Sequence, residues 1–439
     1  MATKENLLDY EQILKLSQEW MASEEFNQQY IQTNHPYPPL LNPKMLEDEN
    51  SPISYKNIPA DFAWEMNLPL PKGYLFLFLM MSHSGHSSMV MYLKKCGVSI
   101  MQDHLFGEGW MKKHYEFNYK ELLNKKTCVI NFTSYGTAPN DWFEDLDKYI
   151  HLISPKTRVL CLVRDPIPRL KVALNNYLGK DYWGKEKLQY FFDENDDLKG
   201  LENRLSYVFN IKSPYKNRVE YIINHGNLFR YSDIYKKLQN LGFKQFDFLD
   251  IQKIIQPEDI FNLMNNLAKE YHFNPPKSVD DFEIPEHRVY SGFLPLRYDV
   301  KGAQFLFTQF LDKKGNVEIT STLKLDLSWF SALGKEMFIY TPPTDLPIIQ
   351  ENFDYVQFKI KTFLNKLREV IELERKERLT SETELLNFFK THLRHRKLFE
   401  NVLKKEIEMV KEHRPDIVQT WHYYLEFEKI CQELNAFKK

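Results

Sequence analysis

The chain has no hydrophobic run long enough to cross a bilayer. Its longest apolar stretch, Leu75–Met81, is short, whereas a membrane-spanning helix needs about 20 apolar residues. The first residues, MATKENLLDYEQ, also show no apolar segment of the signal-peptide kind. Together these absences predict a cytoplasmic protein without a membrane span.

Cysteine is scarce, with four residues in a chain of 439. The four have no spacing typical of metal ligands, and Cys96, Cys128 and Cys161 stand in apolar runs. We therefore expect buried, reduced thiols in a reducing compartment and no bound metal.

Charge of either sign is in no excess, since 58 basic and 60 acidic residues give a formal net charge of −2. Such a chain has no overall attraction for nucleic acid or anionic lipid, so we expect no nucleic-acid partner. Hydrophobic residues make up 43% and aromatic residues 15%, which argues for a sizeable core and against disorder. The length predicts two or three structural units.

Four segments differ in pattern. Residues 1–72 read as an N-terminal helix and a proline-bearing connector, and residues 73–285 as an α/β core in which 185–280 are mainly helical. Residues 286–346 alternate in polarity with turn glycines, which predicts a small antiparallel sheet. Residues 347–439 are strongly helical, with an apolar stripe of Phe363, Leu367, Val370 and Ile371 that favours intramolecular packing.

The core segment predicts a parallel sheet with helices on both faces. Residues 74–81, 127–133 and 158–163 are continuous apolar runs, which is typical of strands buried on both sides. Helical segments separate these runs, as in doubly wound nucleotide-binding sheets. Residues 246–249 are a further candidate, for an edge strand.

The turn after the first strand reads SHSGHSS and is the first candidate for chemistry. A helix N-terminus there would attract a phosphate or sulfate, and a glycine lets the backbone curl around the anion. The two histidines are candidates for proton transfer. The candidate anion-binding residues of this turn are Ser82, His83, Ser84, Gly85, His86, Ser87 and Ser88.

Two observations limit that interpretation. Serines next to a helix start also serve as ordinary N-caps, and this alternative stays open. The turn contains no lysine and is not a GxxxxGK[ST] motif, which argues against ordinary ATP or GTP hydrolysis.

The second candidate is Arg164, which follows the strand 158–163. Ligands of open α/β sheets bind at the carboxyl ends of the strands, where a guanidinium can hold a phosphate in bidentate fashion. Asp165 and Pro166 suit the cap and first turn of a following helix. The alternative is an Arg–Asp surface pair beside a well-capped helix.

Both segments resemble those of P-loop sulfotransferases. Residues 83–87 are similar to the 5′-phosphosulfate loop [KR]-S-G-[ST]-[ST], and Arg164-Asp165-Pro166 is similar to the R-[DN]-P of the 3′-phosphate segment. Residues 228–234, LFRYSDI, resemble a third family segment, [LR]-Y-E-D-L. The chain departs from the family at four positions, with His83 at the basic loop position, His86 at the first hydroxyl position, Val172 for a serine and Ser232 for a glutamate.

The resemblance implies a sulfotransferase-like P-loop fold and a transferase. Such an enzyme moves a sulfuryl group from 3′-phosphoadenylyl sulfate to a glycan or other polar acceptor, with His83 and His86 as candidate catalytic residues and Arg164 as a donor-binding residue. The alternative is a degenerate P-loop protein that binds a nucleotide or sugar phosphate without transfer, as a binding or scaffold protein. The oligomeric state is not predicted.

Two further features complete the sequence. The whole chain resembles a family of unknown function found in Campylobacter and Helicobacter, and residues 59–88, PADFAWEMNLPLPKGYLFLFLMMSHSGHSS, look like its hallmark. The stretch His392–Arg396 carries two histidines three residues apart on an expected helix, and we expect a solvated basic face there rather than a metal site.

Overall fold

The structure is a computed structural model. It describes residues 10–51, 53–81, 83–101, 110–134, 145–175, 190–196, 216–225, 227–254, 256–282, 294–308, 315–327, 337–378 and 380–436. The chain forms two compact units. Unit 1 comprises residues 1–165, 223–282 and 400–422, and unit 2 comprises residues 166–222, 283–399 and 423–439.

Unit 1 contains a four-stranded parallel sheet. Its strands are β1 (Leu77–Met81), β2 (Ile130–Ser134), β3 (Val159–Val163) and β5 (Phe246–Asp250), in the order β2-β1-β3-β5. Leu77 pairs with Ile130 on one side and with Val159 on the other, and Val159 pairs with Phe246. All five residues of β3 are buried. The predicted parallel sheet is thus confirmed, with β5 at an edge.

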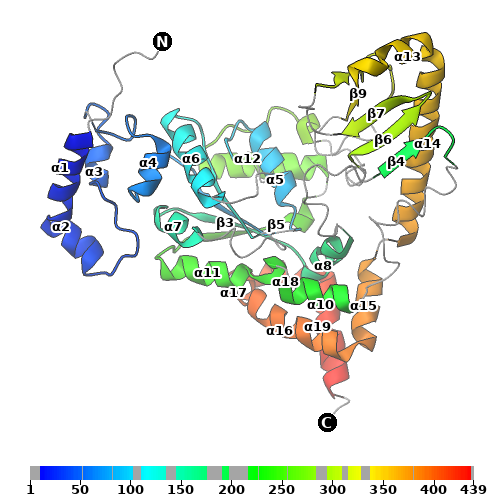
Figure 1. Ribbon diagram of the computed structural model, residues 1–439. Coiled ribbons are helices and arrows are strands. Elements are labelled where there is room, and N and C mark those ends of the chain that lie inside the picture. The colour runs from blue at the N-terminus through cyan, green and yellow to red at the C-terminus, as the bar shows by residue number, and fades with distance from the viewer. Residues whose placement is uncertain are drawn as a thin grey trace. The chain divides into compact units, whose positions relative to one another are not determined.

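Helices cover both faces of this sheet (Figure 1). On one face, Tyr235 of α11 (Tyr231–Asn240) packs against Phe246 and Phe248. On the other face, Tyr271 of α12 (Pro257–Tyr271) donates its hydroxyl hydrogen to Asp247 at 2.7 Å. Successive side chains of a strand point to opposite faces, so β5 alone is enough to place the two helices.

Unit 1 contains further helices besides α11 and α12. They are α1 (Tyr10–Met21), α2 (Glu24–Phe26), a π-helix (Asn27–Ile31), α3 (Pro43–Leu46), α4 (Ala60–Glu65), α5 (His86–Lys95), α6 (Trp110–Leu123), α7 (Leu146–His151), α17 (Glu408–His413) and α18 (Pro415–Gln419).

The N-terminal segment is tied to α6 through tyrosine hydroxyls. Tyr115 donates to the carbonyl of Leu68 and Tyr119 to that of Tyr55, each at 2.8 Å. Both tyrosines are almost fully buried. Because a buried hydroxyl needs a hydrogen-bond partner, these side chains both fill the core and satisfy the connector's backbone.

His114, on the same helix, is buried without such partners. Only 3% of its surface is exposed, and neither ring nitrogen has a hydrogen bond. Its imidazole packs between Trp110 and Tyr149, with ring centroids 4.5 and 6.2 Å away. Burial lowers the pKa of His114 to about 3, because the charged form has lost its hydration. His114 is therefore neutral in the fold.

This burial predicts acid sensitivity. The unfolded chain takes a proton at His114 near pH 6.5, but the folded chain does so only near pH 3, so stability falls as pH drops through that window. Between pH 6.5 and pH 5 the wild-type protein should lose about 2 kcal/mol more free energy of unfolding than the His114→Leu variant, since each pKa unit corresponds to about 1.4 kcal/mol. Urea melts at both pH values would measure it. An equal loss in both proteins would contradict the prediction.

Unit 2 contains a five-stranded sheet. Its strands are β4 (Tyr190–Asp193), β6 (Leu296–Val300), β7 (Ala303–Thr308), β8 (Val317–Glu318) and β9 (Phe338–Thr341), in the order β4-β6-β7-β9-β8. Strands β6 to β9 pair antiparallel, as predicted. The sheet is nevertheless mixed, because β4 pairs with β6 in parallel. Sequence reading had placed β4 in a mainly helical region, since four residues are too few to show a strand period.

The long helix α14 (Phe353–Arg378) covers one face of this sheet. Phe363 stacks on Tyr298 of β6 with centroids 4.2 Å apart and planes 9° apart. Phe363, Leu367 and Val370 are buried in the shared core, which confirms the predicted intramolecular stripe for these three. The side chain of Ile371 lies outside the described residues.

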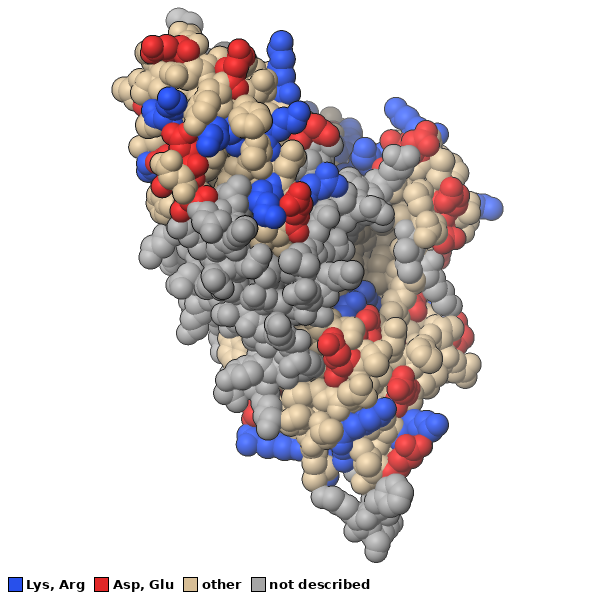
Figure 2. Space-filling view, turned by 90° about the vertical axis from the view of Figure 1, so that its right-hand side faces the viewer, with Lys and Arg blue, Asp and Glu red and all other residues tan. Residues whose placement is uncertain are grey.

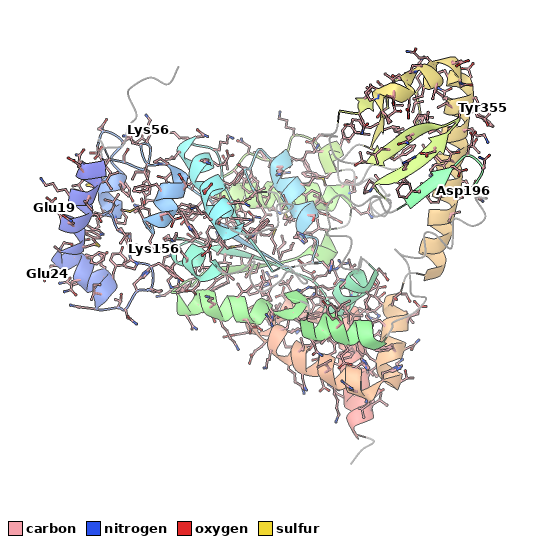
Figure 3. All side chains as sticks on the ribbon, in the orientation of Figure 1. Glu19, Glu24, Lys56, Lys156, Asp196 and Tyr355 are labelled. Carbon is pink, nitrogen blue, oxygen red and sulfur yellow. The ribbon has the colours of Figure 1, made fainter. Side chains whose placement is uncertain are left out.

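The outer side of α14 is tied to the strands by polar contacts. Tyr355, which projects from α14 in Figure 3, donates its hydroxyl hydrogen to Glu194 at 2.8 Å. The other carboxylate oxygen of Glu194 accepts the N–H of Lys301, in the turn between β6 and β7, at 2.7 Å. One carboxylate thus joins β4's end, the hairpin and the helix.

Two phenylalanines of α14 offer a matched test. Phe363→Ala should lower the free energy of unfolding by about 3–5 kcal/mol, the range for a fully buried ring. Phe358→Ala, on the same helix with 63% of its side chain exposed, should change it by less than about 0.5 kcal/mol. Chemical denaturation of both variants measures the difference. Similar losses would contradict the packing described above.

The remaining helices of unit 2 include α8 (Pro166–Asn175), α13 (Leu346–Glu351) and α15 (Glu382–Thr391), while α10 (Lys216–His225), α16 (Leu393–Glu406) and α19 (His422–Ala436) run from one unit into the other. No described helix has a segment long and apolar enough to span a membrane. All four cysteines are buried, as expected for the three in apolar runs.

The expected solvated basic face at His392–Arg396 is wrong for His395 and Arg396, although Arg394 is exposed. His392 ends α15 and stacks on Phe388, while α16 begins at the next residue. His395 and Arg396 are buried, with 7% and 3% exposed. The Arg396 guanidinium donates to the carbonyls of Phe389 and Lys390 at 3.0 and 3.2 Å. A helix end leaves carbonyls that need donors, and here a buried arginine supplies them.

Candidate functional site

The strand order of unit 1 places the site. From β1 the chain passes to β2 on one side, and the next strand of the sheet, β3, lies on the other side of β1. The connections after β1 and β3 therefore leave in opposite directions. In open α/β sheets this is the topological switch point, and ligands bind there outside the carboxyl ends of the strands.

The turn after β1 has an unusual backbone. His83 and Gly85 have φ angles of 63° and 87°, in the left-handed region. Gly85 is the N-cap of α5, and this cap has no side-chain hydrogen bond. The N–H groups of Ser88 and Met89 bond to the Gly85 carbonyl at 3.1 and 3.2 Å and start the helix.

The residues of the turn differ in exposure. Ser84 and Ser88 are buried, while His83, Gly85, His86 and Ser87 are half-buried. Ser82 lies outside the described residues. α5 has ten residues, and its N-terminus, the positive end of the helix dipole, lies at the turn. The arrangement suits an anion better than a cation.

Arg164 follows β3 and reaches this turn. Its Nη1 donates to the carbonyl oxygen of His83 at 3.1 Å. The two segments singled out from the sequence, 83–88 and Arg164, are therefore neighbours in space, although 81 positions separate the bonded residues. The bond also fixes the guanidinium beside the backbone that starts α5. Asp165, the next residue, is fully buried.

Gly85 has no room for a side chain. A Cβ placed on it would lie 2.7 Å from Cγ1 of Ile251, the residue directly after β5. Ile251 therefore packs over the α-carbon of the turn. The left-handed φ and the contact with Ile251 both disfavour any residue other than glycine at position 85.

The end of β5 was not identified from the sequence as part of the candidate site. Asp250 and Ile251 stand at the same carboxyl edge as the turn and Arg164. The strand itself was predicted, since residues 246–249 were a candidate for an edge strand. The contact with Gly85 was not visible, because a strand's neighbour cannot be read from its own period.

Gly85→Ala tests the crowding. The change should cost about 1–2 kcal/mol for the left-handed backbone and more for the displacement of Ile251. Gly73→Ala is the control, because Gly73 has φ 111° but no atom within 4 Å of its added Cβ. Thermal melts should show a larger loss for Gly85→Ala, and Ile251→Ala should recover part of it in the double variant. Equal losses at both glycines would contradict the contact.

A second arginine, Arg158, marks the opposite end of β3 and has a different environment. Its Nε donates to Asp247 at 2.9 Å, and its Nη2 pairs with Glu270 at 2.5 Å. Its guanidinium also lies 4.6 Å from the ring centroid of Tyr271. Arg158 is thus neutralised by protein carboxylates and binds α12 to the sheet.

Charges of both signs are mixed on the face shown in Figure 2. Lys and Arg side chains are interspersed with Asp and Glu over the described part of the face in Figure 2. Within the described residues, no group of three or more His, Cys, Asp or Glu side chains could hold a metal ion.

Comparison with known proteins adds one match. Residues 248–434 match a family model described as "Protein of unknown function (DUF2972)". No curated protein and no solved structure matches the chain. The match supports the expected resemblance to a family of unknown function over residues 248–434, and it does not include the hallmark segment 59–88. It begins inside β5 and includes Asp250 and Ile251, but not the turn or Arg164.

Proposed function

We propose that the switch point between β1 and β3 binds the phosphate groups of an anionic nucleotide, and that the protein is a sulfotransferase-like enzyme. The observation that carries the proposal is the hydrogen bond between Arg164 and the His83 carbonyl. It joins two segments that resemble donor-binding motifs at the edge where α/β sheets bind ligands.

The proposed roles follow from charge and reach. The N-terminus of α5 and Arg164 bind phosphate oxygens of 3′-phosphoadenylyl sulfate. An acceptor hydroxyl, on a glycan or another polar molecule, forms a bond to sulfur as the bond from sulfur to the donor's phosphate oxygen breaks. The bisphosphate leaves with that electron pair, and His83 or His86 takes the acceptor's proton. Histidine suits this step near neutral pH.

A second candidate is binding without transfer. The turn contains no lysine or arginine, whereas transfer through an in-line transition state needs positive groups at the equatorial oxygens. A protein with this site would bind a nucleotide or sugar phosphate as a scaffold or sensor. Turnover of a sulfuryl donor in the presence of a mixed glycan acceptor separates the two candidates.

Binding is tested with 3′-phosphoadenosine 5′-phosphate and isothermal calorimetry. Wild-type protein should bind, and Arg164→Lys should lose about 1.5–3 kcal/mol of binding free energy, the scale of hydrogen bonds to charged groups. Lysine keeps the charge but not the planar fork of donors. Arg158→Lys is the matched control, and it should lower stability while leaving affinity unchanged.

Two results would contradict the proposal. The absence of any binding or melting shift at millimolar 3′-phosphoadenosine 5′-phosphate would exclude the sulfotransferase-like function and leave the second candidate, the binding of another nucleotide or a sugar phosphate. Unchanged affinity in Arg164→Lys, with reduced stability, would make Arg164 a structural residue that only holds the His83 carbonyl.

A further inference from the structure

The end of β5 is in direct contact with the proposed anion-binding turn. Ile251 is 9% exposed and its Cγ1 occupies the space where a side chain of Gly85 would stand. The position of Ile251 therefore sets how far the turn 83–86 can move toward β5. Whatever fixes Ile251 also restrains the backbone that starts α5.

Asp250, the residue before Ile251, is fixed by two hydrogen bonds. The indole Nε1 of Trp421 donates to one carboxylate oxygen at 3.0 Å, and the backbone N–H of Gln252 donates to the other at 3.0 Å. Asp250 and Trp421 are 5% and 2% exposed. A buried carboxyl oxygen that loses its hydrogen-bond partner costs free energy, so the two donors favour this position of the Asp250 side chain.

The segment that carries Trp421 is anchored on β5 independently. Arg414 donates from Nη1 to the carbonyl of Phe248 at 3.3 Å, and the ring of His413 stacks on Phe248 with centroids 5.6 Å apart. β5 is an edge strand, and edge strands leave backbone groups that need partners or cover. Residues 400–422 supply that cover within unit 1.

We propose that Trp421 is a positioning residue for the anion-binding turn. Its indole N–H holds Asp250, Asp250 sets the backbone that follows β5, and Ile251 then holds the turn through the α-carbon of Gly85. The inference rests on the proposed function, which gives the turn its ligand. Asp250, Ile251 and Trp421 lie in the region matched by the family of unknown function, and Gly85 does not. The matched region therefore completes a site whose anion-binding residues lie outside it.

Hydrogen exchange of the ligand-free protein tests the contacts directly. Trp421→Phe keeps an aromatic ring but removes the N–H donor. The amides of residues 83–89 should then exchange about three- to tenfold faster, the effect of losing one hydrogen bond of ordinary strength. Trp20→Phe is the matched control, since the buried Trp20 donates its indole N–H to the Pro39 carbonyl at 2.9 Å in the same unit. It should leave these amides unchanged.

Ile251→Ala tests the contacts that lead from Trp421 through Asp250 and Ile251 to Gly85, and it leaves Trp421 unchanged. It should accelerate exchange at residues 83–89 to a similar extent, and Trp421→Phe should add little in that background, because both changes break the same chain of contacts. Unchanged exchange in Ile251→Ala, equal effects of Trp421→Phe and Trp20→Phe, or fully additive effects would each overturn the inference.

Nucleotide titration of the same variants separates this inference from the proposed function. If wild-type protein binds 3′-phosphoadenosine 5′-phosphate, Trp421→Phe should weaken binding about three- to tenfold and Trp20→Phe should not. If wild-type protein binds no nucleotide but exchange at 83–89 responds as described, the proposed function fails while the contact route stands. Normal affinity in Trp421→Phe together with faster exchange would overturn the positioning role.

Discussion

The parallel pairing of β1 with β3 is the constraint on which the candidate site depends. It places the chain ends that follow both strands at one edge, although they are far apart in sequence. Parallel strands with helices on both faces are buried throughout, so the sheet is rigid where the turn and Arg164 leave it. A hydrogen bond of 3.1 Å then joins the two. Without that pairing, Arg164 would not lie beside the turn.

The sequence was informative where the physical signal is local. Continuous apolar runs predicted β1, β2 and β3 because full burial demands apolar residues on both faces. The left-handed turn at Gly85 and the arginine at the strand end could likewise be located from residue type and position. The stripe of Phe363, Leu367 and Val370 was visible because helical spacing repeats over many turns.

Features that depend on distant partners could not be read in this way. β4 is a strand because β6 offers its edge, and four residues carry no period of their own. His395 and Arg396 were assigned to solvent by residue type, yet the carbonyls at the end of α15 and the rings around them bury both. Ile251 looked like an ordinary apolar residue, and its contact with Gly85 comes from tertiary packing alone.

If the site binds an anion as proposed, the relative size of the free-energy contributions would make Arg164 its dominant anion-binding group. A helix N-terminus contributes about 0.3–1 kcal/mol to anion binding at an exposed position, and hydrogen bonds to a charged group contribute about 1.5–3 kcal/mol. The turn has no lysine or arginine to add a fixed charge. In the proposed function, affinity for the anion would therefore depend on how accurately one guanidinium and one turn are held together. That requirement gives a physical reason for the crowded packing of Ile251 on Gly85, since a site with few charges gains most from rigidity.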